Sequence, residues 1–194
     1  MKTKNEARAV LVILKGPEKE YNANSLSKTL GITSMGTLKI LKRLEKEGVL
    51  ATRKVSNISL YRVNSGNPYA LDYASFLLKD EAEHSPSHVK RWITEVRKAK
   101  EAEIAVVFGS VLNAGGKARD IDVLFVVSGE RLGALQGEIG RINSLNEKSI
   151  HPVFQTRADL LKNIRKGDSV ILNAVKGVVA FGEREFVCLM GGAV

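Results

Sequence analysis

Cysteine and aromatic residues are scarce in this sequence, and no long apolar run occurs in it. The single cysteine, Cys188, excludes an intrachain disulfide and any zinc site built from several cysteines. No apolar run approaches the roughly 20 residues that a membrane-spanning helix needs. The basic opening segment, MKTKNEARAV, lacks the apolar stretch of a secretory signal peptide. We therefore expect a cytoplasmic protein with no membrane partner.

Acidic residues are scarce only in the first third of the chain. The formal net charge is +9, and residues 1–63 hold 13 Lys or Arg against 5 Asp or Glu, a difference of +8. Residues 64–194 hold 17 against 16, a difference of +1. A strongly basic segment beside a nearly neutral one indicates two modules, the first of which faces a polyanion. A solvated basic surface without a partner is the alternative.

Three helices followed by a hairpin are expected in the first module. The apolar period predicts helices over residues 6–14, about 24–30 and about 34–47. Asn24 or Ser25 is the expected cap of the second helix, and Thr33 or Ser34 is that of the third. Stop signals follow these helices, and they are Gly16-Pro17, Gly31 and Gly48. Alternating residues over 49–63, with a turn at Ser56-Asn57, then predict a β-hairpin.

This order of elements resembles the winged helix-turn-helix family. The resemblance is carried by SLSKTLGITSMGTLKILKRLEKEGVLATRK, in which the ending Leu-Glu-x-x-Gly-x-Leu precedes a basic hairpin. It implies a DNA-binding domain over residues 1–66. Winged-helix proteins usually read two half-sites, so a homodimer is one possible assembly.

The third helix is the expected recognition element. In such domains the N-terminal residues of this helix reach base edges, while flanking cations neutralise phosphates. We expect the helix to bury Leu38, Leu41 and Leu44 and to present its other face to DNA. The candidate contacts on that face are Ser34, Thr37, Lys39, Lys42 and Arg43. The candidates on the hairpin are Arg53 and Lys54.

A break and two further helices separate the modules. Turn-forming residues over 64–68 interrupt the pattern, and apolar stripes at helical spacing follow over 71–78 and 89–96. We interpret residues 67–102 as a helical connector.

The last module, residues 103–194, is organised around two short motifs. An apolar run over 104–108 ends in Gly109-Ser110, and Asp120 and Asp122 lead into a second apolar run. Positions two apart in a strand point to the same face, so these aspartates aim two carboxylates together. Strands alternate with helices through the rest of the module, which predicts an α/β or α+β sheet domain.

Phe108-Gly109-Ser110 followed by Asp120-Ile121-Asp122 resembles the nucleotidyltransferase fold of the DNA polymerase β superfamily, most closely its minimal members. The segment 177–182 is similar to that family's last strand. The resemblance implies a small domain with a mixed sheet flanked by helices, which binds a nucleoside triphosphate and Mg²⁺. It implies Asp120 and Asp122 as metal ligands and catalytic residues. The implied contacts of the nucleotide phosphates are Gly109, Ser110, Lys117 and Arg119.

One part of that pattern is missing. Active members of the family supply a third carboxylate from the next core strand, and here residues 149–156 read SIHPVFQT, without Asp or Glu. Asp159 and Asp168 lie beyond this strand, and His151 or Gln155 is a weak substitute. The missing charge favours a domain that binds nucleotide or protein without catalysis.

Three interpretations follow from the sequence. The first is a DNA-binding, transcription-regulator-like protein whose second domain binds a nucleoside triphosphate and Mg²⁺. The second is an active nucleotidyltransferase that modifies a small molecule, a protein or RNA. The third is a non-catalytic adaptor, similar to an antitoxin that pairs with another protein. The missing third carboxylate favours the first and third, and the intact aspartate pair favours the first and second.

Overall fold

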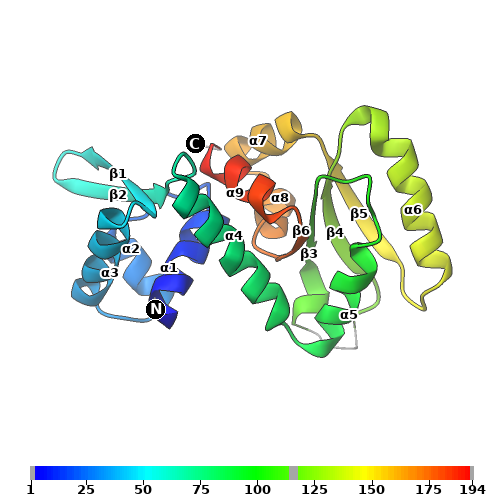
Figure 1. The fold of residues 1–194 in the computed structure, drawn as a ribbon, viewed down its shortest axis with the longest axis horizontal. Coiled ribbons are helices and arrows are strands. Elements are labelled where there is room, and N and C mark those ends of the chain that lie inside the picture. The colour runs from blue at the N-terminus through cyan, green and yellow to red at the C-terminus, as the bar shows by residue number, and fades with distance from the viewer. Residues whose placement is uncertain (1–2, 114–117, 193–194) are drawn as a thin grey trace. The chain divides into compact units, whose positions relative to one another are not determined.

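The structure is a computed structural model, and it describes residues 3–113 and 118–192 (Figure 1). The chain is of the mixed α/β class and forms two compact units. Met1–Leu77 together with Val187–Val194 form the first unit, and Leu78–Phe186 form the second. The stretch predicted as a connector is therefore shared between the units, because α4 (Pro68–Glu83) has residues in both. The last helix, α9 (Glu183–Gly191), also has residues in both.

The first unit begins with three helices and a two-stranded antiparallel sheet, in the order predicted from sequence. The helices are α1 (Lys4–Lys15), α2 (Ala23–Leu30) and α3 (Ser34–Lys46). The strands are β1 (Leu50–Val55) and β2 (Ile58–Val63), joined by the predicted turn at Ser56-Asn57. Its largest fully buried side chains are leucines from all of these helices and from β1, namely Leu14, Leu26, Leu41, Leu44 and Leu50.

Local caps set the ends of α2 and α3. Asn22 accepts a hydrogen bond from the Ser25 backbone N–H at 2.9 Å, so α2 begins earlier than the predicted cap at Asn24 or Ser25. Gly31 ends α2 with φ +70°, a conformation that its missing Cβ permits. Thr33 accepts a hydrogen bond from the Gly36 backbone N–H at 3.1 Å, which confirms one of the two predicted caps for α3.

The second unit is built on a mixed sheet with the strand order β5-β4-β3-β6. The strands are β3 (Ile104–Phe108), β4 (Ile121–Val126), β5 (Ile150–Gln155) and β6 (Val178–Phe181). β4 and β5 are parallel, whereas β3 is antiparallel to both of its neighbours, β4 and β6. All residues of β3 are buried, as its continuous apolar sequence predicts for a central strand.

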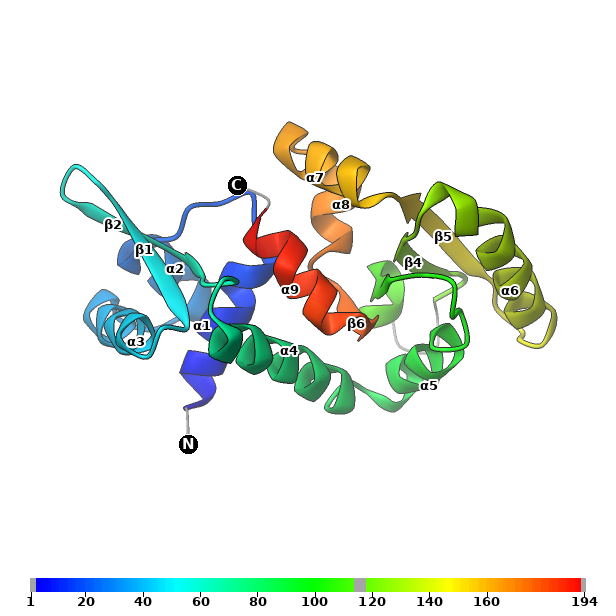
Figure 2. The same ribbon diagram turned by 45° about the horizontal axis from the view of Figure 1, so that its top comes forward.

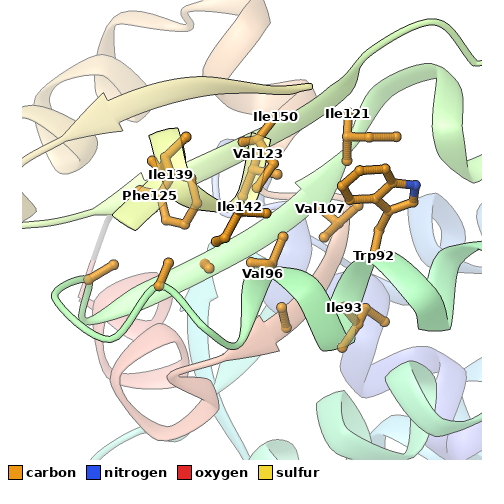
Figure 3. Close-up of a cluster of buried hydrophobic side chains, with 14 of the residues drawn as sticks. Trp92, Ile93, Val96, Val107, Ile121, Val123, Phe125, Ile139, Ile142 and Ile150 are labelled. Atoms are coloured by element: carbon orange, nitrogen blue, oxygen red, sulfur yellow. The ribbon is translucent and has the colours of Figure 1, made fainter. Parts of the chain in front are cut away.

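Helices cover both faces of this sheet (Figure 2). One face is covered by α5 (Ser87–Val96) and α6 (Leu132–Ser144), and Trp92 packs there near Val107 and Ile121 (Figure 3). The helices α7 (Arg157–Lys166) and α8 (Ser169–Ala174) pack against β5 and β3. Residues alternate between the faces along each strand, so Asp122 points away from the cluster that contains Ile121 and Val123.

Membrane spans were not expected from the sequence, and the helices in residues 3–113 and 118–192 agree with this. None of them is long and apolar enough to cross a bilayer.

Candidate functional site

The exposed face of α3 carries a row of long side chains. Met35, Lys39, Lys42 and Lys46 recur three or four residues apart, so they lie along one side of the helix. All four are exposed, and the Met35 side chain reaches 65% exposure. Ser34 is also exposed at the first turn, where its Oγ lies 3.2 Å from Ser27 Oγ. The row offers three ammonium groups to one surface.

Thr37 does not belong to that surface, and its prediction as a DNA contact needs correction. Its side chain is fully buried beside the positions of Leu41 and Leu44. The hydroxyl donates to the Thr33 carbonyl at 3.0 Å. This internal hydrogen bond removes the cost of burying the hydroxyl, which is why a polar residue can join the apolar face. Leu38, predicted inside, is only half-buried.

Arg43 is engaged within the first unit. Its Nη2 forms an ion pair with Glu6 Oε1, whose side chain is fully buried while that of Arg43 is half exposed. Glu6 also caps α1, since its Oε2 accepts from the Thr3 backbone N–H at 2.6 Å. A buried carboxylate needs a nearby counter-charge. Arg43 therefore joins α3 to α1, a role that the sequence prediction of a phosphate contact did not include.

The hairpin presents a second group of cations. Arg53 Nη2 forms an ion pair with Glu20 Oε1, and their side chains are 62% and 48% exposed. Lys54 is exposed on the same strand. The turn includes Ser56 with φ +52°, and Ile58 just beyond it is 51% exposed. The tip of the hairpin thus combines charge with exposed apolar surface.

Gly109 makes a close approach that no other residue could make without strain. Its φ is +77°, and a Cβ built on it would lie 2.2 Å from Asp122 Oδ2. The glycine opens the 3-10 helix η1 (Gly109–Leu112), in which Ser110 is exposed. His88 Nε2 lies 3.0 Å from the Val111 carbonyl oxygen and ties this turn to α5. A backbone turn and a carboxylate are thereby held side by side.

The predicted carboxylates occupy the start of β4. Asp122 pairs in register with Phe108 of β3 and with His151 of β5. Its carboxylate is 34% exposed, and Oδ1 lies 3.7 Å from His151 Nδ1. Asp120 and Arg119 are exposed just before the strand, whereas Lys117 falls outside the described residues. Sequence reasoning considered His151 only as a weak substitute, and the parallel pairing of β4 with β5 brings it to Asp122.

Neither of the later aspartates supplies a third carboxylate. Asp159 accepts a hydrogen bond from the Thr156 hydroxyl at 2.7 Å at the start of α7, and Asp168 caps α8. Gln155 accepts from Asn163 Nδ2 at 2.7 Å. Within residues 3–113 and 118–192, no group of three or more His, Cys, Asp or Glu is arranged to hold a metal ion. Carboxylate oxygens are ligands that a hard cation prefers, and Asp120 and Asp122 are the two acidic residues at this end of β4.

Comparisons with known proteins leave the family open. No protein-family model and no curated protein matches the sequence. Among solved structures, a mutant of ZitR from Lactococcus lactis matches with a TM-score of 0.34 and 18% sequence identity. The match covers 50% of this chain and 60% of that chain. Similarity of this size establishes neither a shared fold nor a shared partner.

Proposed function

We propose that the first unit is a winged helix that binds duplex DNA and that the protein acts as a transcription-regulator-like factor. The observation that carries this proposal is the row of three exposed lysines on α3, Lys39, Lys42 and Lys46. It lies on a helix with a capped and exposed N-terminus, in a segment with a charge difference of +8 over residues 1–63. Lysines at this spacing suit phosphates along a groove.

The proposed DNA contacts fall into two groups, contacts with base edges and contacts with phosphates. Ser34 and Met35, which are exposed at the start of α3, would meet base edges. The lysines of the row and Lys54 on the wing neutralise phosphates. Arg53 also contacts a phosphate once its ion pair with Glu20 is broken, and an exposed ion pair of this kind is weak. Thr37 is replaced by Met35 in this set, and Arg43 supports the position of α3.

The salt dependence of binding tests this function. Full-length protein is titrated into a labelled 25-base-pair duplex at 50 to 200 mM salt, and binding is followed by fluorescence anisotropy. Four phosphate contacts give a slope of about −3.6 in log K against log salt, hence a loss of roughly 100-fold across this range. Absence of binding at 50 mM salt, or affinity that does not change with salt, contradicts the proposal.

We also propose that the second unit binds the phosphates of a nucleoside triphosphate with Mg²⁺. The supporting observation is the close approach of the Gly109 backbone to the Asp122 carboxylate, directly before the exposed Ser110. Asp120 and Asp122 would hold the cation, which would neutralise the phosphate charge. Transfer of a nucleotide is not part of this proposal, because β5 provides no acidic residue to complete a two-metal centre.

Thermal stability with ligand tests the second proposal. A triphosphate at 100 times its Kd with Mg²⁺ stabilises the folded protein by about 2.7 kcal/mol, which is measurable as a rise in Tm. The D120N/D122N variant should lose this rise, and E130Q, at an exposed position of the same unit, should keep it. Equal stabilisation of all three proteins contradicts the site. Label transfer from the triphosphate would establish an enzyme, and no effect at all would favour the adaptor interpretation.

A further inference from the structure

A cavity of about 280 Å³ lies within the first unit, and none of its lining residues belongs to α3. One wall is a face of the hairpin, where Leu60 and Arg62 are two positions apart and Arg53 pairs in register with Leu60. The opposite wall comes from the end of α1, with Ile13 and Leu14. Met190, from the part of α9 that belongs to this unit, closes one side.

Close backbone contacts build this cavity. The Tyr61 backbone N–H donates to the Tyr21 carbonyl at 2.8 Å, which fixes the segment after α1 beside β2. A Cβ on Gly16 would lie 2.1 Å from the Tyr21 hydroxyl, and one on Gly191 would lie 2.3 Å from Ser65 Oγ. Gly191, which lines the cavity, therefore allows the end of α9 to approach Ser65 closely. Burial raises the pKa of the Tyr61 hydroxyl, with Glu45 adding to the shift, so this lining residue is neutral at ordinary pH.

The lining combines an apolar floor with an excess of positive charge. Lys19, Arg53 and Arg62 contribute three cations and Glu20 one anion, so the net charge is 3 − 1 = +2. The rest of the lining is mostly apolar. Pockets that take small molecules usually combine an apolar lining with a few polar groups that fix orientation. The volume of about 280 Å³ lies just below the usual range of such pockets and therefore suits a small ligand.

We propose that this cavity binds a small amphipathic carboxylate. The apolar tail packs between Leu14, Leu60 and Met190, and the carboxylate takes the place of Glu20 at the Arg53 guanidinium. Arg53 and Glu20 are both about half exposed, and such surface ion pairs are weak enough to be exchanged. Guanidinium also matches a carboxylate with two parallel hydrogen bonds. Arg53 is also among the proposed DNA contacts, so an effect of the carboxylate on DNA binding would rest on the proposed function. Binding of the carboxylate to the cavity does not depend on the proposed function.

Calorimetric titration of the full chain with octanoate, without DNA, tests the site. We expect saturable binding at one site, at least tenfold tighter than that of octanamide, which has the same tail and no charge. The R53Q variant should bind both ligands equally. The L60W variant, which fills the cavity, should bind neither.

Three results would overturn the proposal. The first is equal affinity of the unmodified protein for octanoate and octanamide, including no binding of either. The second is unchanged octanoate binding by R53Q, and the third concerns L60W. Arg53 is exposed, so the R53Q substitution should leave the fold intact. R53Q therefore tests the site even if L60W does not fold. Circular dichroism shows whether each variant is folded. Binding that persists in a folded L60W protein places the ligand elsewhere and also rejects the site.

Discussion

Reversal of two charges on α3 should lower the affinity for duplex DNA by on the order of 100-fold at 100 mM salt. The variant is K39E/K42E, which replaces two phosphate contacts by two repulsive charges on the exposed row. Both lysines are exposed, and neither side chain contributes to the core around Leu41 and Leu44. The slope of log K against log salt should also become shallower by about 1.8, since two contacts are lost. Fluorescence anisotropy with the same duplex measures both quantities.

The matched control is K162E/K166E, which makes the same change in net charge on α7 of the second unit. These lysines are also exposed and lie on one side of their helix. If net charge alone attracts DNA, both double variants lose the same affinity. If α3 is the recognition element, the control retains most of it. Equal loss in the two variants would reject α3 as the interface.

Introduction of a single methyl group at Gly109 should remove stabilisation by triphosphate and Mg²⁺ and lower the free energy of unfolding by about 2 kcal/mol. In G109A, the new Cβ meets Asp122 Oδ2, and the backbone at φ +77° is strained for any residue with a side chain. The carboxylate must turn away, so the proposed metal ligand leaves its position. Urea denaturation measures the stability, and the Tm with ligand measures binding.

Gly137 supplies the comparison for G109A. It lies in α6, is exposed, and a Cβ on it would meet nothing within 4 Å. G137A should therefore raise the free energy of unfolding by up to about 1 kcal/mol, because alanine favours the helix. The triphosphate should stabilise this variant as it does the unmodified protein. Full ligand stabilisation of G109A would show that the position of Asp122 does not matter for binding.

Much of the secondary structure could be predicted because its signals are local. Thr33 caps α3 through the N–H group three residues later, and Gly31 ends α2 by its own backbone conformation. The continuous apolar run of β3 and the turn at Ser56-Asn57 are likewise visible in a few neighbouring residues. Asn22 was missed because Asn22, Asn24 and Ser25 can each cap a helix, and the local sequence does not select among them.

The candidate contacts were less predictable because the burial and the partners of these side chains depend on tertiary packing. The polar identity of Thr37 suggested exposure, but a hydrogen bond to Thr33 and the adjacent core allow its burial. Arg43 lies on a basic helix face, and only the packing of α1 brings the buried Glu6 to it. Tertiary packing likewise brings Arg53 of the hairpin to Glu20, which lies 33 positions earlier in the chain.

The sequence by itself determined the order of the elements, the basic character of the first unit and the presence of two carboxylates without a third. Composition, caps and apolar periodicity need no knowledge of tertiary contacts. The tertiary structure decided that His151 faces Asp122 and that Gly109 approaches it closely. It also decided that the end of α9 belongs to the first unit. Strand pairing and core packing join segments far apart in sequence, and no local pattern specifies which segments will meet.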